Sequence, residues 1–161
     1  MDGHAVFQML KRAGGGGVAI VALVAVVLAG GLAYLFLASE DMGADPTDRA
    51  QVARGEVVYA QHCARCHGAR LEGQPNWRER LANGRLPSPP HDSSGHTWHH
   101  ADGQLFELTK HGVAPFAPEG YESDMPAYDG TLVDREIWDV LAFIKSAWPP
   151  EIRARQARLN Q

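Results

Sequence analysis

The strongest constraint in this sequence is an uncharged apolar run near its N-terminal end. Residues 18–37 (VAIVALVAVVLAGGLAYLFL) contain no charged side chain. At about 1.5 Å per residue, an α-helix of roughly 20 residues spans about 30 Å, which is the hydrocarbon thickness of a bilayer. A cleavable secretory signal has a shorter apolar core, of about 7–15 residues, followed by a small-x-small cleavage site. The length of the run therefore favours a retained transmembrane anchor over a cleaved signal.

Charges on either side of the run indicate its orientation. Lys11 and Arg12 precede it, whereas Glu40 and Asp41 follow it, and basic residues are enriched on the cytoplasmic side of membrane helices. We therefore expect residues 1–17 to form a cytoplasmic tail and the chain after the span to lie outside. That outer portion has 13 Lys and Arg against 18 Asp and Glu, a balance that argues against nucleic acid as a partner.

Beyond the span, the sequence divides into three segments. Residues 38–44 read as a short polar linker, residues 45–148 as one small domain, and residues 149–161 as a C-terminal surface tail with a short helix. No internal repeat is present, so repeat architectures are excluded. Within the domain, residues 68–101 are rich in Gly, Pro, Asn and Ser and are expected to form loops.

Three helices are expected in the domain. The first opens at Asp45-Pro46, an N-cap followed by proline, and runs to about His62. The second covers residues 102–111 and ends at Gly112. The third opens at Thr131, and its apolar residues recur at helical spacing until two prolines stop it: Val133, Ile137, Val140, Leu141, Ile144, Pro149 and Pro150. With no sustained strand alternation, the predicted fold class is all-α with long loops, which usually surround a functional group.

The chain has only two cysteines, in the pattern Cys63-x-x-Cys66-His67, which is the signature of covalent c-type haem attachment. One helical turn separates the thiols, so both can form thioethers to the haem vinyl groups while the adjacent histidine faces the iron. Three other interpretations compete. An exported domain permits a structural disulfide, a thioredoxin-like pair needs a βαβ context that is absent, and a zinc site needs four ligands. The adjacent histidine and the helical surroundings favour haem.

Residues 55–68 (GEVVYAQHCARCHG) resemble the N-terminal helix and haem-binding motif of class I cytochromes c, and the resemblance extends over the whole expected domain. It implies a cytochrome c fold with loops wrapped around one covalent haem c. It also implies that Gly55 and Tyr59 pack against Val140 and Phe143 of the last helix. A membrane-anchored bacterial member would be a single-pass protein of the inner membrane with its haem domain on the periplasmic side.

The resemblance also implies the iron ligands. His67 would be the proximal ligand, and the distal ligand of the family is a methionine in the loop before the last helix. Met125 is the only methionine of the expected domain. A lone methionine is more often core filler, but its polar loop and the family pattern favour ligation, since His/Met pairs are usual in electron-transfer haems.

One further site residue is assigned by the same resemblance. The carbonyl of Pro75 would accept the Nδ1 proton of His67, unless Pro75 simply marks a turn. Trp98, with Arg78 or Trp77, would donate to a haem propionate. Four histidines within residues 91–100 either lie near the surface or bind copper, nickel or zinc.

An iron with two protein ligands has no open position for a substrate, so we expect an electron-transfer protein and not an enzyme. The first hypothesis is a membrane-tethered carrier between a quinol-oxidising complex and a terminal oxidase or another periplasmic acceptor. The second is a fixed haem subunit of a larger membrane oxidoreductase, with the transmembrane helix serving in assembly. A metal-handling protein that uses the histidines of residues 91–100 is the third.

Overall fold

The computed structural model describes residue 20, residues 22–31 and residues 42–161. The chain divides into two units, Met1–Asp41 and Met42–Gln161. Within the expected span 18–37, the described residues are helical and exposed, and the others lie outside the described part of the chain, as does the expected tail 1–17. Among the described residues, no helix is both long enough and apolar enough to cross a bilayer.

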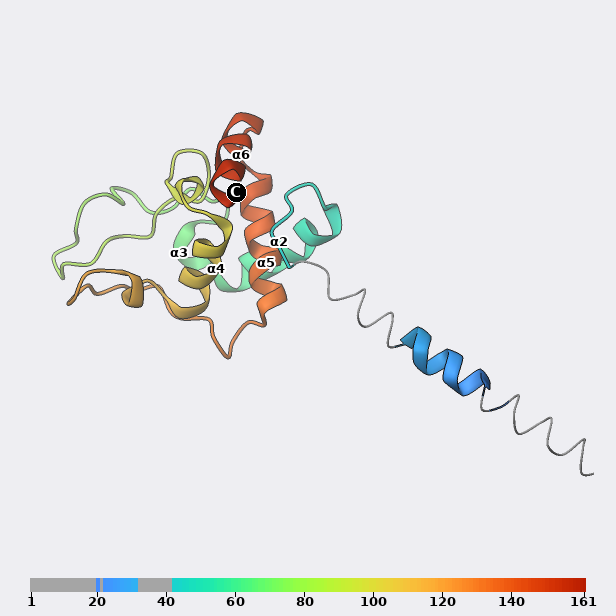
Figure 1. The fold of residues 1–161 in the computed structure, drawn as a ribbon. Coiled ribbons are helices and arrows are strands. Elements are labelled where there is room, and N and C mark those ends of the chain that lie inside the picture. The colour runs from blue at the N-terminus through green and yellow to red at the C-terminus, as the bar shows by residue number, and fades with distance from the viewer. Residues whose placement is uncertain (1–19, 21, 32–41) are drawn as a thin grey trace, which may run out of the picture. The chain divides into compact units, whose positions relative to one another are not determined.

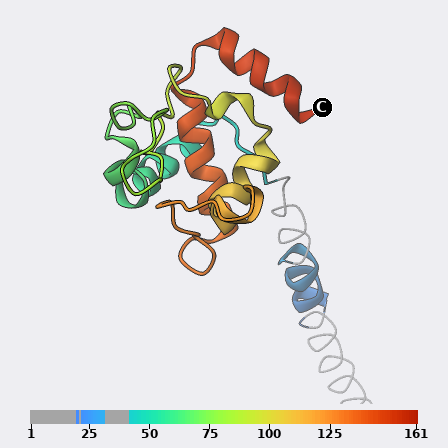
Figure 2. The same cartoon turned by 90° about the vertical axis from the view of Figure 1, so that its left-hand side faces the viewer.

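The unit Met42–Gln161 is helical, and none of its residues forms a strand, which confirms the all-α prediction (Figure 1). Its elements are, in order, α2 (Arg49–His62), α3 (Ala64–His67), η1 (Thr97–His99), α4 (Asp102–His111), η2 (Ala114–Phe116), α5 (Asp134–Ser146), α6 (Pro150–Ala157) and η3 (Arg158–Asn160). Two long segments connect them, residues 68–96 and residues 117–133. Both project from the same side of the helices (Figure 1 and Figure 2).

Helix α2 begins later than expected. The carboxylate of Asp48 accepts hydrogen bonds from the backbone N–H groups of Ala50 and Gln51, at 2.9 and 3.2 Å, which is the role of an N-cap. The prediction of Asp45 as the cap was wrong. Its carboxylate instead accepts bonds from the backbone and hydroxyl of Thr47, at 2.8 and 2.7 Å, and so closes a turn ahead of the helix.

The other two predicted helices are present, one with a different start. Helix α4 has the expected bounds and ends at Gly112, whose φ of +75° is the left-handed conformation that glycine favours. The prediction that Thr131 caps α5 was wrong, because its N–H bonds the carbonyl of Tyr128 in a preceding turn. The helix begins after Val133, whose N–H donates to the Glu136 carboxylate at 2.9 Å.

The domain is organised around the crossing of α2 and α5. A Cβ atom on Gly55 would overlap the backbone carbonyl of Asp139 and lie 2.9 Å from the Cβ of Phe143, so only glycine allows this approach. Beside it, Arg54 binds the Asp139 carboxylate through Nε and Nη2, at 2.7 and 2.8 Å. Tyr59 contacts Phe143 with ring centroids 5.3 Å apart. The predicted packing of Gly55 and Tyr59 against the expected third helix, α5, is confirmed. Other apolar residues of α2 and α5 are buried in the same core: Val58, Ile137, Val140, Leu141 and Ile144.

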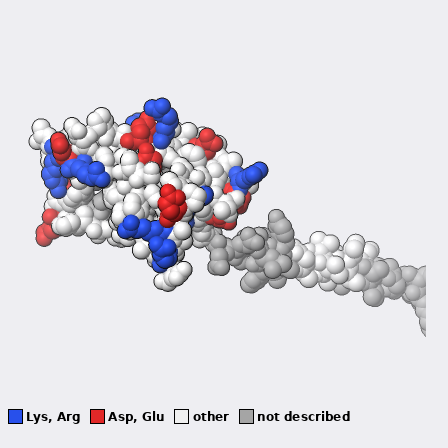
Figure 3. All heavy atoms as spheres, turned by 90° about the horizontal axis from the view of Figure 1, so that it is seen from above, with Lys and Arg blue, Asp and Glu red and all other residues white. Residues whose placement is uncertain are grey.

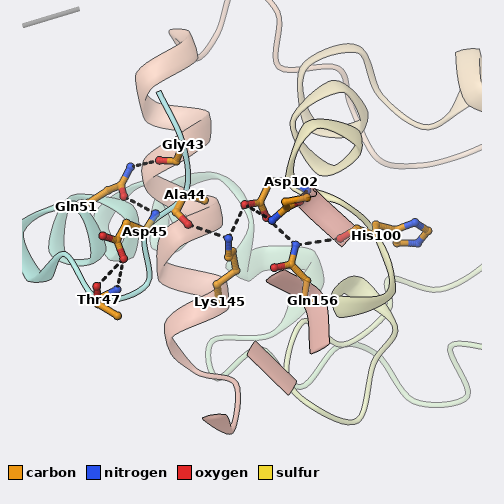
Figure 4. Close-up of polar contacts among 10 residues, drawn as sticks. Gly43, Ala44, Asp45, Thr47, Gln51, His100, Asp102, Lys145 and Gln156 are labelled. Atoms are coloured by element: carbon orange, nitrogen blue, oxygen red, sulfur yellow. Dashed lines mark hydrogen bonds and ion pairs between the residues drawn. The ribbon is translucent and has the colours of Figure 1, made fainter. Parts of the chain in front are cut away.

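A buried polar network fixes both ends of the domain (Figure 4). Lys145, which is 6% exposed, donates to the Ala44 carbonyl at 2.8 Å and to the Asp102 carboxylate at 2.6 Å. Gln156, which is fully buried, donates to Asp102 at 2.7 Å and to the His100 carbonyl at 3.1 Å.

Two predicted boundaries are corrected by this network. The end of the expected linker 38–44 belongs to the domain, because Ala44 is buried and the Gly43 carbonyl accepts a bond from the Gln51 amide at 2.8 Å. The expected surface tail 149–161 is also part of the domain, because Gln156 joins α6 to α4. The predicted helix in that tail is confirmed as α6.

The Gly55 contact can be tested by adding one methyl group. Gly55→Ala forces α2 away from the Asp139 carbonyl, so the free energy of unfolding should fall by about 1–3 kcal/mol despite the better helix propensity of alanine. Urea unfolding of the holoprotein, followed by circular dichroism, measures this change. Gly103→Ala is the matched control, because a Cβ there meets nothing within 4 Å. Equal stability of the two variants would contradict the proposed close contact.

Candidate functional site

The two cysteines lie at the junction between α2 and α3. Cys63 closes α2, with its N–H bonded to the Tyr59 carbonyl at 2.9 Å, and its own carbonyl accepts from Cys66 and His67 at 3.0 and 2.9 Å. This geometry places the thiols within one turn. Both are free and partly buried, so the disulfide alternative is not formed. Burial raises the pKa of the Cys63 thiol to about 11.

The imidazole of His67 is buried and held from one side. Its Nδ1 lies 2.8 Å from the carbonyl oxygen of Pro89, so a proton on Nδ1 donates to that oxygen. Burial lowers the pKa of His67 more than this hydrogen bond raises it. Neutral imidazole with its proton on Nδ1 leaves Nε2 as a lone-pair donor, and no hydrogen bond from the described residues occupies Nε2.

The prediction that Pro75 supplies this carbonyl was wrong. Gln74 and Ser88 close the base of a loop through two hydrogen bonds, from the Gln74 N–H to the Ser88 carbonyl at 2.9 Å and from the Ser88 N–H to the Gln74 side chain at 3.1 Å. This closure brings Pro89, the next residue, beside His67, while Pro75 stays exposed at the start of the loop. The family resemblance assigned the nearer proline, but the loop closure selects the farther one.

A second histidine, which sequence reasoning did not place here, lies against the first. The rings of His91 and His67 are stacked, with centroids 4.0 Å apart and an interplanar angle of 23°. Nδ1 of His91 lies 2.8 Å from the Thr97 hydroxyl, and its carbonyl accepts from the Trp148 indole at 2.8 Å. Burial, followed by repulsion from His67 and His96, lowers the pKa of His91 well below its usual value. The ring is therefore a neutral packing partner of His67.

Trp98 and Arg78, which were expected to serve the same haem propionate, contact different side chains. The indole Nε1 of Trp98 is buried without a hydrogen-bond acceptor among the described residues, and its ring stacks on His99 at 3.7 Å with the guanidinium of Arg155 4.9 Å from its centre. Arg78 lies instead over the ring of Trp77, at 4.1 Å.

Met125 lies in the segment that precedes α5. It is partly buried, and its N–H donates to the Ser123 hydroxyl at 3.1 Å. Three residues further on, the Tyr128 hydroxyl donates to the carbonyl of His62 at 2.7 Å. This bond ties the segment that carries Met125 to the end of α2, immediately before the first cysteine.

A protein-family model described as "Cytochrome C oxidase, cbb3-type, subunit III" matches residues 50–144. The match covers more than half of the chain and includes both cysteines, His67 and Met125. The chain belongs to this family of c-type cytochromes. No curated protein and no solved structure gives a significant match. Membership implies a covalently bound haem c and a role in electron transfer.

The residues of this cytochrome fit a haem. Two free thiols one turn apart match the two vinyl groups of the macrocycle, and His67 presents an unoccupied Nε2 beside them. The buried N–H of Trp98 provides an independent observation. A buried donor without an acceptor is costly, and a haem propionate would be an acceptor that the described residues do not provide.

The four histidines of residues 91–100 do not converge on one point in this cytochrome. His91 stacks on His67, His96 stacks on Trp77 at 5.2 Å, and His99 stacks on Trp98. Nδ1 of His100 lies 3.1 Å from the Gln104 side chain. Among the described residues, no group of three or more His, Cys, Asp or Glu side chains is arranged to hold a metal ion.

Replacement of the unpartnered indole tests the fit. Trp98→Phe keeps an aromatic ring but removes the N–H, so the negative charge of a propionate would act more strongly on the iron. The reduction potential should therefore fall by on the order of tens of millivolts. A spectroelectrochemical titration measures this shift. Trp138→Phe, which alters an indole stacked on Phe106, is the control, and equal potentials in the two variants would count against a propionate at Trp98.

Proposed function

We propose that this protein is a one-electron carrier with a single haem c, attached through Cys63 and Cys66 and ligated by His67 and Met125. The observation that carries the proposal is the state of His67. Its ring is buried, the Pro89 carbonyl at 2.8 Å from Nδ1 favours the tautomer with the proton there, and Nε2 has no hydrogen bond from the described residues. The two free thiols belong to the same motif. Such a ring is prepared to bind iron without moving or losing a proton.

A bound haem would supply one-electron redox chemistry, and His67 and Met125 are the residues that would hold its iron. The protein holds the ligand geometry fixed, so that little reorganisation accompanies the electron. The Pro89 carbonyl and the His91 ring hold the His67 imidazole from two sides, and the Trp98 N–H would donate to a haem propionate. A six-coordinate iron leaves no site for a substrate, which supports a carrier and not an enzyme.

Membrane attachment is part of the proposal. It is supported by the uncharged run 18–37 and by the charges on either side of it. These charges favour a haem domain on the periplasmic side of the inner membrane. Five residues, 38–42, separate the run from Gly43, the first residue that hydrogen bonds hold to the domain. Fully extended, they reach about 17 Å. A tether of that length keeps the domain close to membrane-bound partners.

A second candidate function is a fixed haem subunit of an oxidase complex. The description of the matching family, which names a cbb3-type oxidase subunit, favours it, and the short tether agrees with it. Basic and acidic side chains are interspersed on the face of the domain in Figure 3. This pattern suits recognition by short-range contacts better than long-range steering by a field of one sign.

Methionine ligation is tested by Met125→Ala. Loss of the thioether should abolish the far-red sulfur-to-iron charge-transfer band of the ferric protein and lower the reduction potential, because the soft thioether favours ferrous iron. Absorption spectroscopy and a redox titration measure both. Met42→Ala is the control, since Met42 is 58% exposed at the start of the domain. A Met125→Ala protein that keeps its band has a different distal ligand.

Attachment is tested by fractionation of cells that produce the full chain. The haem-containing protein should sediment with membranes at its full length and be released by mild detergent. A soluble, shortened cytochrome would show that residues 18–37 are a cleaved signal. In the detergent eluate, stoichiometric oxidase subunits would identify a fixed subunit, whereas the cytochrome alone would identify a mobile carrier.

A further inference from the structure

The loop between Gln74 and Ser88 meets the segment that carries Met125. The 74–88 loop is closed at its base by the Gln74–Ser88 hydrogen bonds. Its tip is a tight turn in which the Leu81 N–H donates to the Arg85 carbonyl at 2.8 Å and Gly84 has a φ of +84°. The turn directs the Arg85 side chain at the methionine loop, which we define as residues 117–133.

The Arg85 guanidinium holds two carboxylates of the methionine loop. Its Nε and Nη2 both donate to Glu122 at 3.1 Å, and its Nη1 donates to Asp124. Asp124 is the residue directly before Met125. The Arg85 side chain is 36% exposed, against 68% for Glu122 and 56% for Asp124, so the cation is the more enclosed partner. A planar guanidinium that binds two carboxylates restricts the loop more than a single ion pair does.

The two halves of the methionine loop are held differently. On the C-terminal side of Met125, the Tyr128 hydroxyl bonds the His62 carbonyl and the Asp129 N–H bonds the Lys110 carbonyl at 2.9 Å. On its N-terminal side, Arg85 makes all the hydrogen bonds and ion pairs between residues 118–124 and other described segments. Met125 therefore sits between a hydrogen-bonded anchor and an ionic one.

We propose that Arg85 is a positioning residue that keeps Met125 on the haem iron by fixing Glu122 and Asp124. The inference rests on the proposed ligation by Met125. The 74–88 loop leads directly into Pro89, which holds the proximal histidine, so a single loop constrains both axial ligands. Release of the ionic anchor loosens residues 118–124, which keep the weaker contact of the Arg80 guanidinium, 5.8 Å from the centre of the Tyr121 ring. It therefore raises the fraction of time that the methionine is off the iron.

The test measures how fast imidazole binds the ferric holoprotein in detergent, because imidazole can bind only when Met125 leaves. Arg85→Gln should raise this rate about fivefold, the effect expected for a partly exposed ion-pair network. Arg85→Lys should give an intermediate rate, since lysine keeps the charge but cannot hold both carboxylates in a fork. Arg158→Gln makes the same change of charge at a residue that forms no ion pair with the described part of the chain, and its rate should equal that of the wild type.

Salt provides a second measurement that needs no mutation. Between about 0.01 and 1 M salt, the Debye length falls from about 30 to 3 Å, so the wild-type rate should rise while the Arg85→Gln rate stays constant. A merely structural role would leave both proteins equally insensitive to salt. An Arg85→Gln protein that binds imidazole at the wild-type rate and with the wild-type salt dependence would overturn the role of Arg85. That result would leave methionine ligation intact. A wild-type ferric protein without the far-red band would overturn methionine ligation, and this inference with it.

Discussion

The close approach of two backbones at Gly55 determines the position of everything that follows it in the site. Because α2 touches the Asp139 carbonyl without an intervening side chain, the two helices cross at one defined point. The Arg54–Asp139 ion pair prevents either helix from sliding along the other. Tyr59, one turn later, packs on Phe143 and donates its hydroxyl to the Gly68 carbonyl at 2.8 Å. The segment that carries the thiols and His67 therefore starts and ends at residues fixed by this crossing.

Loops, not helices, complete the surroundings of the site. A loop buries few apolar side chains, so its conformation depends on hydrogen bonds that reach other elements. Each loop here has such bonds. The Trp148 indole holds His91, and Tyr128 ties its loop to the end of α2. The 74–88 loop is in addition closed on itself by Gln74 and Ser88. Each contributes only about 1 kcal/mol of net stability, but together they select one arrangement among the many that loops of this length could adopt.

Local patterns in the sequence predicted the elements whose signals are local. Helix α4 was predicted with its observed bounds, because apolar periodicity and Gly112 agree on where it ends, and the cysteine motif needs only one helical turn to bring its residues together. Contacts between distant segments were not predictable in this way. Either Asp45 or Asp48 could have capped α2, and the choice depends on Thr47. Pro89, not Pro75, reaches His67 because a loop closes between Gln74 and Ser88, which are 14 positions apart in sequence. The burial of Gln156 requires a partner more than 50 residues distant.

The pairing of α2 with α5 also sets the order in which the chain can become compact. The Arg54–Asp139 contact joins residues 85 positions apart, so α2 lacks α5, the helix that it crosses at Gly55, until nearly the whole chain has been made. At a synthesis rate of about 5–20 residues per second, that interval lasts roughly 4–17 s. During this time the cysteine motif at the end of α2 is an accessible peptide with reactive side chains. The late arrival of α5 thus leaves an interval for covalent attachment before the crossing at Gly55 fixes the helix that leads into the cysteine motif.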